Sequence, residues 1–393
     1  MTPIATQSIR SIAAASLVAV LSACADFAPR DDTQRPPEVA AAEAIELEPG
    51  TPPPVLLDPD SLWRSTQPLE PDSAYLIDDP EAVEADFEPL KTADIWDRIR
   101  GGLGFDTSER TRRRTQREIE WFQRNQEYLD RMAERARFYL PYIVRQVEKR
   151  GLPSELALLP VVESAFQPFA YSPAGAAGLW QFMPGTGRVF GLKQNWWYDG
   201  RRDVVESTEA ALTYLERLSG HFNGDWLLAI AAYNWGEGNV LRAIRRNRRA
   251  GKSTDFWSIR LPRETRGYVP RLLALAAIVK EPQRYGLDLA EIEDDPYFEV
   301  VDVDSQIDLA HAAELAEMSL EEIYLLNPGF NRWATDPDGP HRLLLPAGRV
   351  ERFRQGLAEM PPEERVAYRR HEIRSGESLI GIAKRYRTSV RTI

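Results

Sequence analysis

The sequence predicts a mainly helical domain followed by small modules that mix helices and strands. Two patterns indicate this. Apolar residues recur at three- and four-residue steps through the middle of the chain, and strand-like alternation is confined to the part after Pro282. One cysteine in 393 residues excludes a fold held by disulfide bridges within the chain. The length suits one sizeable core with one or two small modules.

The first 23 residues read as the signal peptide of a lipoprotein. Arg10 precedes an apolar run, 12–21, that is too short for a permanent membrane span. The run ends in Leu21-Ser22-Ala23-Cys24, which resembles a bacterial lipobox, so we expect lipidation at Cys24 and membrane attachment there. Since Ala25 follows the cysteine, the sorting pattern of such lipoproteins implies the outer membrane of the cell envelope, facing the periplasm. An ordinary signal peptide with an incidental cysteine is the alternative.

Residues 24–105 are expected to form an acidic, proline-rich tether. Eleven prolines lie between Pro36 and Pro89, and residues 31–100 hold 18 acidic against 5 basic side chains, a net charge of −13. Such a chain stays extended because it has little apolar surface to bury. Its short apolar piece, Ile95 to Ile99, is suited to docking on a folded domain.

Residues 106–290 are expected to form the helical domain. One apolar stripe joins Ile119, Phe122, Leu129, Met132, Ala136, Tyr139, Ile143 and Val147, and Gly151 with Pro153 ends it. Ser154 is the expected cap of a short helix from Leu156 to Glu163. The later helices are expected over Glu209 to His221 (after Ser207-Thr208), Trp226 to Tyr233 and Arg271 to Lys280.

Two small modules are expected after the helical domain. Residues 296–350 show the order strand, helix, helix, strand, with strands at 298–303 and 342–345 and helices at 309–316 and 320–326. Residues 369–393 repeat the first half of this order. They break off before a closing strand, so we expect the natural chain to continue and this copy not to fold stably.

The helical part is basic although the whole chain is acidic. Residues 101–290 hold 21 acidic and 29 basic side chains, a net charge of +8. A solvated surface explains this as well as attraction to a polyanion such as a wall polymer with peptide carboxylates. No signature favours nucleic acid. The four histidines, His221, His311, His341 and His371, lack metal-ligand spacing, so neither a metal nor another cofactor is expected.

Four short segments in the helical domain suggest chemistry. They are Val161 to Phe166 with Ser172 nine residues after Glu163, Gly178 to Pro184, Ala232 to Gly236, and Glu264 to Pro270. Each alone has an ordinary explanation. A glutamate at a helix end is usually solvated, and a Trp-Gln-Phe-Met run is usually part of a core.

In this order and spacing the four segments resemble the lytic transglycosylase family, with its goose-lysozyme-like fold, over Leu152 to Tyr285. The resemblance implies a lysozyme-like catalytic domain acting on peptidoglycan glycan strands without a cofactor. It implies that Glu163 is the only catalytic carboxylate. It also implies a set of substrate-binding residues: Ser172, Gln181, Met183, Tyr233, Asn234 and Tyr268.

The two small modules resemble LysM modules, which bind glycans containing N-acetylglucosamine. The copy at 369–393 matches the first half of such a module. The copy at 296–350 is degenerate because Ser305-Gln306 stands where a glycine turn is expected. A packing domain without sugar affinity therefore explains this copy equally well.

The surroundings of Glu163 predict an acid that holds its proton near neutrality. Val161, Val162, Ala165 and Phe166 are apolar, and desolvation should raise the carboxyl pKa from about 4.3 towards about 6. A glycosidase normally adds a second carboxylate. The nearest acids downstream, Asp199 and Asp203, lie in a polar stretch that reads as a loop.

One acid suffices when the attacking hydroxyl belongs to the sugar. In the family, the glutamate protonates the bond between N-acetylmuramic acid and N-acetylglucosamine and then takes the proton of the C6 hydroxyl, which closes onto C1 as a 1,6-anhydro ring. A hydrolytic muramidase on the same fold remains an alternative, as does a non-catalytic peptidoglycan-binding lipoprotein.

Overall fold

The structure, a computed structural model, describes residues 94–105, 109–366, 373 and 376–385. The expected signal peptide, Cys24 and the tether up to residue 93 lie outside these residues. Within the described part of the chain, no helix has both the length and the apolar character needed to cross a membrane.

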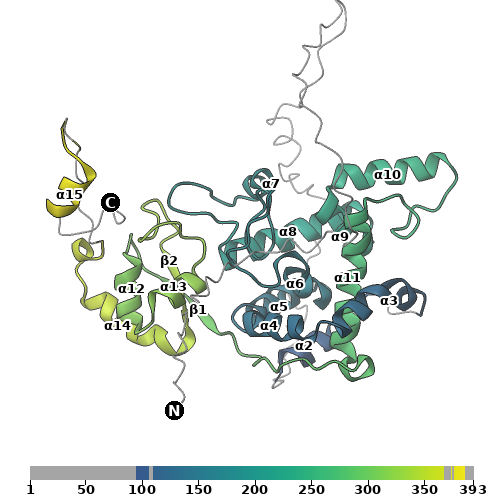
Figure 1. The fold of residues 1–393 in the computed structure, drawn as a ribbon, viewed down its shortest axis with the longest axis horizontal. Helices are drawn as coiled ribbons and strands as arrows, with labels where there is room; N and C mark the ends of the chain where they lie inside the picture. Colours follow the sequence, from purple (N-terminus) through teal and green to yellow (C-terminus); the bar gives the residue numbers. More distant parts are fainter. Residues whose placement is uncertain (1–93, 106–108, 367–372, 374–375, 386–393) are drawn as a thin grey trace, which may run out of the picture. The chain divides into compact units, whose positions relative to one another are not determined.

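The first part of the described chain is helical (Figure 1). Its helices are α2 (Ile95–Gly101), α3 (Glu109–Gln123), α4 (Gln126–Ala136), α5 (Leu140–Lys149), η1 (Ser154–Leu158), α6 (Leu159–Ser164), α7 (Pro184–Val189), α8 (Val204–His221), α9 (Trp226–Trp235), α10 (Glu237–Arg249), α11 (Arg263–Lys280) and η2 (Pro282–Tyr285). The predicted mainly helical fold is confirmed.

The predicted apolar stripe forms one side of the helical core, and all eight of its residues are buried. It runs over three helices rather than one. The side-chain amide of Asn125 donates to the backbone oxygen of Trp121 (2.6 Å), a local bond that competes with helix continuation between α3 and α4. Most of the favourable energy here is apolar burial, shared with α9 and α11.

The last residues of the expected tether pack on the helical part. Ile95, Trp96 and Ile99 on α2 are fully buried in the helical core, and the Trp96 indole donates to the backbone oxygen of Ala290 (2.9 Å). This agrees with the docking expected of the short apolar piece from Ile95 to Ile99. Burial of three large apolar side chains within five residues stabilises the packing of α2, although the sequence before it is acidic.

Three expected helix starts are wrong, and one of them is that of α11, which begins at Arg263 and not at Arg271. Helix α8 begins at Val204, where the Asp203 carboxylate accepts from the backbone N–H of Glu206 (2.8 Å). Ser207 and Thr208 are buried inside the helix, so they are not its cap. Ser154 caps no helix either, since it is the first residue of η1 and its N–H donates to the oxygen of Gly102 (3.0 Å).

The second part is a LysM-like region with a two-stranded antiparallel sheet. Strands β1 (Phe298–Asp302) and β2 (Arg342–Pro346) pair with Val300 opposite Leu344, and α12 (Leu309–Ala316) and α13 (Leu320–Leu326) lie between them in sequence. The predicted order of strand, helix, helix, strand is confirmed. The Ser319–Glu322 capping box starts α13.

The LysM-like region extends beyond the expected end at residue 350. After η3 (Ala347–Arg349), helix α14 (Val350–Glu359) buries Val350, Phe353 and Leu357 in the same cluster as α12, and η4 (Pro362–Glu364) follows. Arg365 donates to the backbone oxygen of Val303 (3.0 Å). The helix was missed because an amphipathic segment after a closing strand looks like a linker. Of the copy expected at 369–393, α15 (Leu379–Arg385) is described.

A polar seam joins the LysM-like region to the loop 193–203 of the helical part. Asp336 is fully buried and accepts from Lys193 (2.9 Å) and from the Asn195 amide (2.6 Å). Backbone bonds run from Asp199 N–H to the oxygen of Gly329 (2.8 Å) and from Asn331 N–H to the oxygen of Trp197 (2.7 Å). We use "the seam" for these contacts below.

Candidate active site

Glu163 occupies the last turn of α6, where the backbone turns sharply. Ala165 and Phe166 follow with φ angles of 50° and 56°, and their N–H groups donate to the oxygens of Val161 (3.1 Å) and Pro160 (3.3 Å). Two consecutive non-glycine residues in the left-handed region are unfavourable, and such strain persists where the surroundings fix it, often at functional sites. The side chain of Phe166 is fully buried, which holds this turn.

The Glu163 carboxyl is shielded by protein and has a single described hydrogen-bond donor. The hydroxyl of Tyr268 on α11 donates to its Oε1. Burial raises the pKa of Glu163 from about 4.5 to about 7; the Tyr268 hydrogen bond opposes this shift and the charge of Glu264 adds to it. The shift has the direction predicted from the apolar neighbours, because desolvation disfavours the charged form.

Tyr233 and Asn234 reach the site from the end of α9. The Tyr233 hydroxyl donates to the backbone oxygen of Trp180 (2.9 Å), and burial followed by the charge of Glu163 raises the Tyr233 pKa well above 10. Asn234 accepts through its side-chain oxygen from the hydroxyl of Thr265 (2.8 Å), a buried residue on α11. Thr265 stood in the fourth segment without a role.

A loop from 169 to 183 carries the remaining predicted site residues. Ser164 donates to the backbone oxygen of Leu179 (3.0 Å), which ties this loop to α6. Gln181 has a φ of 48° and donates to the oxygen of Gly178 (2.8 Å), whereas the Met183 side chain is exposed. Ser172 accepts from the N–H of Ala176 (3.0 Å), so its described hydrogen bonds stay within its own turn.

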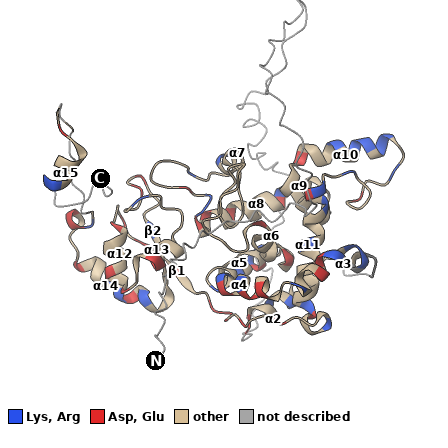
Figure 2. Ribbon diagram, in the orientation of Figure 1, with Lys and Arg blue, Asp and Glu red and all other residues tan. Residues whose placement is uncertain are grey.

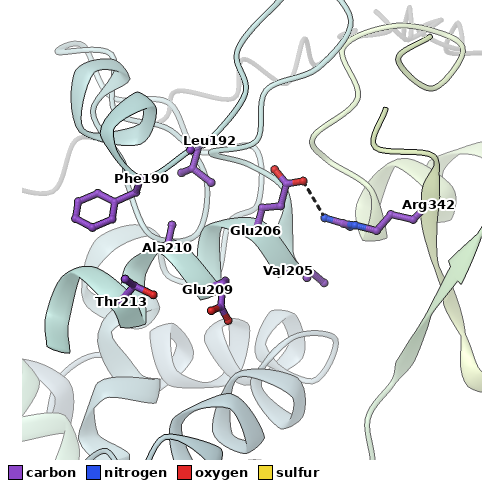
Figure 3. A pocket seen from close by; sticks show the side chains of 9 residues that line it. Phe190, Leu192, Val205, Glu206, Glu209, Ala210, Thr213 and Arg342 are labelled. Atoms are coloured by element: carbon purple, nitrogen blue, oxygen red, sulfur yellow. Dashed lines mark hydrogen bonds and ion pairs between the residues drawn. The ribbon is translucent and has the colours of Figure 1, made fainter. Parts of the chain in front are cut away.

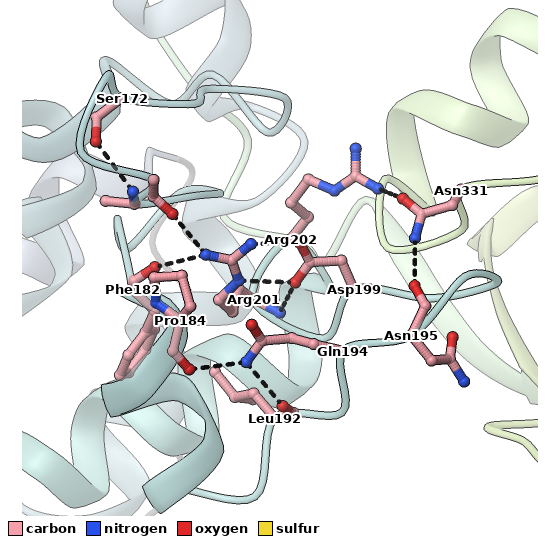
Figure 4. A network of polar contacts seen from close by, with 12 residues as sticks. Ser172, Phe182, Pro184, Leu192, Gln194, Asn195, Asp199, Arg201, Arg202 and Asn331 are labelled. Atoms are coloured by element: carbon pink, nitrogen blue, oxygen red, sulfur yellow. Dashed lines mark hydrogen bonds and ion pairs between the residues drawn. The ribbon is translucent and has the colours of Figure 1, made fainter.

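Arg201 organises this loop, and sequence reasoning missed it (Figure 4). Its guanidinium is nearly buried, pairs with Asp199 (2.7 Å), and donates to the backbone oxygens of Gly175 (2.6 Å) and Phe182 (3.3 Å). Gly178, with a φ of +79°, passes so close that a Cβ there would lie 2.1 Å from the Arg201 oxygen. Arg201 therefore links the loop that bears Gln181 to the seam.

The two acids considered as second carboxylates are both engaged elsewhere. Asp199 holds Arg201, and Asp203 caps α8 and pairs with Arg342 (3.0 Å). Glu264, an exposed residue at the start of α11, is the acid whose charge acts on Glu163. The sequence contained this signal, since Glu264 opens the same segment as Tyr268.

A separate pocket of about 360 Å³ lies between α8 and Arg342 (Figure 3). Its lining includes Phe190, Leu192, Glu206 and Glu209 and none of the predicted site residues, so we assign the chemistry to Glu163 and not to this pocket. Among the described residues, no group of three or more His, Cys, Asp or Glu side chains is arranged to hold a metal ion.

Comparison with known proteins places these features in a family. Residues 142–256 match the transglycosylase SLT domain, and residues 297–361 match the LysM-like domain of lytic transglycosylase MltD. The chain is 40% identical over 334 residues to the membrane-bound lytic murein transglycosylase D of Escherichia coli, which covers 81% of this chain and 71% of that protein. The chain belongs to the lytic transglycosylase family.

Other lytic transglycosylases match a shorter part. The soluble lytic murein transglycosylase of Salmonella typhimurium is 33% identical over 122 residues, or 29% of this chain and 18% of that protein. The X-ray structure of an inactive mutant of the lytic transglycosylase Slt from Pseudomonas aeruginosa is 31% identical, covers 38% of this chain and 25% of that chain, and has a TM-score of 0.28.

Proposed function

We propose that this lytic transglycosylase cleaves the bond between N-acetylmuramic acid and N-acetylglucosamine in peptidoglycan, with Glu163 as the only general acid and base. The observation that carries the proposal is a carboxyl group with a pKa of about 7 and a single described donor, the Tyr268 hydroxyl. A carboxyl with this pKa is protonated in a large fraction of molecules near neutrality, as proton donation requires.

The reaction then needs two proton transfers at one group. Protonated Glu163 gives its proton to the oxygen of the glycosidic bond, and the bond to C1 of the muramic sugar breaks. The resulting carboxylate takes the proton of the C6 hydroxyl of that sugar, and the C6 oxygen bonds to C1. The leaving sugar keeps the first proton and Glu163 regains the second, so neither water nor a cofactor is consumed.

Neighbouring residues have supporting roles in this proposal. The Tyr268 hydroxyl stabilises the Glu163 carboxylate between the two transfers, because a hydrogen bond to the charged form lowers its free energy. Tyr233 and Asn234 position the reacting sugar at the end of α9. Ser172, Gln181 and Met183 contact the glycan strand from the loop 169–183, which also bears Trp180.

Mass spectrometry of the soluble products from purified sacculi tests the function. We expect ends that carry a 1,6-anhydro ring, one water lighter than hydrolysed ends. Reducing ends in their place would mean that water attacks C1. The chain would then be a muramidase, and Glu264 would be the first carboxylate to examine as the group that activates the water.

The N-terminal residues bear on where the protein lies in the cell. Relatives of this chain are named membrane-bound. We propose that Cys24 carries the lipid after removal of residues 1–23, and that the enzyme is held at the outer membrane facing the periplasm. Cys24→Ser should move the protein from the membrane fraction to the soluble fraction after cell lysis. Unchanged membrane retention would contradict lipidation at Cys24.

A further inference from the structure

Helix α10 carries basic side chains over much of its length (Figure 2). Residues 237–252 hold five arginines and one lysine against a single acid, Glu237. Four of the arginines, Arg242, Arg245, Arg246 and Arg249, follow one another at steps of three, one and three residues, so they share one face of the helix. All four are exposed. We call these four residues the arginine stripe.

The stripe is not explained by the stability of the helix. Cations in the last turn interact favourably with the helix dipole, but Arg242 and Arg245 lie before that turn. The pairs Arg242/Arg246 and Arg245/Arg249 have like charges four residues apart, which costs about 0.2–0.5 kcal/mol per pair. Glu237 pairs with His221 (2.7 Å) and approaches Arg217 (3.9 Å), and no ion pair joins the stripe to a carboxylate within the described residues.

The stripe is presented on a rigid element. The opposite face of α10 buries Val240, Ala243 and Ile244 in the helical core. At the far end, the Asn247 amide donates to the backbone oxygens of Ser253 (2.7 Å) and Ser258 (2.9 Å), which fixes the loop that follows. The helix backbone therefore holds the Cα atoms of the stripe at a defined place.

The helix starts beside the proposed sugar site. Gly236 joins α9 to α10, two residues after Asn234. At 1.5 Å per residue, Arg242 and Arg249 lie roughly 9 and 20 Å along the helix from this joint. An extended peptide of about five residues spans at most about 17 Å. A short peptide on a sugar bound near Asn234 can therefore reach the stripe.

We propose that the arginine stripe binds the free carboxylates of the peptides that the glycan strand carries, so that the enzyme prefers peptide-bearing strands to bare ones. The inference rests on the proposed function, because it takes the substrate to be such a strand. Guanidinium groups suit this ligand, since they pair with carboxylates through two parallel hydrogen bonds. An anionic lipid surface is less well matched, because the apolar residues of α10 face the core and leave no apolar face for insertion.

The test compares two forms of one ligand. Binding is measured on the full chain carrying Glu163→Gln, so that strands are not consumed, with labelled soluble glycan strands and with the same strands after amidase has removed the peptides. We expect Arg242→Gln/Arg246→Gln, the pair within reach of such a peptide, to raise the Kd for peptide-bearing strands about three- to tenfold at low salt, as two exposed ion pairs allow. The Kd for bare strands should change less than about twofold, and the difference should vanish near 1 M salt, where charges are screened within about 3 Å.

Arg113→Gln/Arg117→Gln on α3 is the matched control, since it removes two exposed arginines, also four residues apart, from another helix and should alter neither Kd. Equal weakening for both forms of the strand, or no change for either, would overturn the proposal. So would unchanged strand binding together with lost sedimentation on phosphatidylglycerol vesicles, which would assign the stripe to a lipid surface. Cleavage of peptide-bearing strands by the unaltered chain is followed in parallel. Its absence would contradict the proposed function, while the binding difference still decides the role of the stripe.

Discussion

Glu163 and Asp336 are two carboxyl groups withdrawn from water, and their pKa values move in opposite directions. Burial raises the pKa of Glu163 to about 7, because its one described donor is a neutral hydroxyl and Glu264 adds negative charge. Burial acts the same way on Asp336, but hydrogen bonds from Lys193 and Asn195 outweigh it and hold the pKa of Asp336 below its ordinary value. Their partners therefore make Glu163 an acid in the active site and Asp336 a permanent anion in the seam.

The hydrogen-bond and ion-pair partners of a buried carboxyl decide whether it is protonated or charged near neutral pH. A group without a cation exchanges protons near neutral pH, which suits catalysis but weakens the fold when the group ionises. A group with a cation and several donors stays charged and joins two parts of the molecule. Substitutions can distinguish the two groups, because Glu163 should control activity and Asp336 should control stability.

The largest effect is expected for Glu163→Gln. The amide can neither donate the proton to the leaving oxygen nor take one from the C6 hydroxyl, and losing one such transfer costs on the order of 10²–10⁴ in rate. Since one group serves both transfers, the release of soluble products should fall below detection. Residual activity near that of the unaltered chain would remove Glu163 from the mechanism.

The same variant should not lose stability. A carboxyl whose folded pKa is raised holds a proton that the unfolded chain has released, so the fold loses stability as pH rises from about 4.5 to about 7. Glu163→Gln removes this loss, and its thermal midpoint at pH 8 should equal or exceed that of the unaltered chain. A lower midpoint at pH 8 would mean that the carboxylate stabilises the fold.

Asp336→Ala should lower stability and leave activity nearly unchanged. Lys193 and Asn195 would lose a buried partner, which should lower the free energy of unfolding by about 2 kcal/mol. Thermal or urea unfolding of the full chain measures this. At a temperature where the variant is folded, the turnover number should stay within a few-fold, because Asp336 lies in the seam. A loss of turnover as large as that of Glu163→Gln would contradict the claim that Asp336 acts on stability and not on catalysis.

Smaller effects are expected from the two neighbours of Glu163, and they should have opposite signs. Tyr268→Phe removes the hydrogen bond that lowers the Glu163 pKa, so the fall of kcat/KM at high pH should move to higher pH. Glu264→Gln removes a charge that raises this pKa, so the fall should move to lower pH. The pH profiles of kcat/KM for the two variants test this. Shifts of the same sign would show that a group other than Glu163 controls the fall at high pH.

Parts of this picture could be predicted from the sequence, because their signals are local. The stripe from Ile119 to Val147 and the helices at 309–316 and 320–326 follow from periodicity and capping residues. The apolar neighbours of Glu163 gave the direction of its pKa shift. The first and fourth segments hold the two residues that meet at the site, since the Tyr268 hydroxyl donates to Glu163.

Other parts depend on contacts between residues distant in sequence. Arg201 looks like one more loop cation, and its bonds to Gly175 and Phe182 exist only after the chain has folded. The burial of Trp96 depends on Ala290, which is 194 residues away. The left-handed residues Ala165 and Phe166 carry no glycine signal, since packing forces a conformation that their residue types disfavour.

The pKa of Glu163 itself is the most direct test of this account. Glutamate labelled with ¹³C at the side-chain carboxyl would be followed by NMR across pH 3 to 9, with Glu163→Gln identifying the signal. We expect one carboxyl to titrate near pH 7 and to be missing from the variant. A Glu163 signal with its midpoint below about pH 5, in the ordinary range of glutamate, would contradict the claim that one desolvated carboxyl supplies both proton transfers.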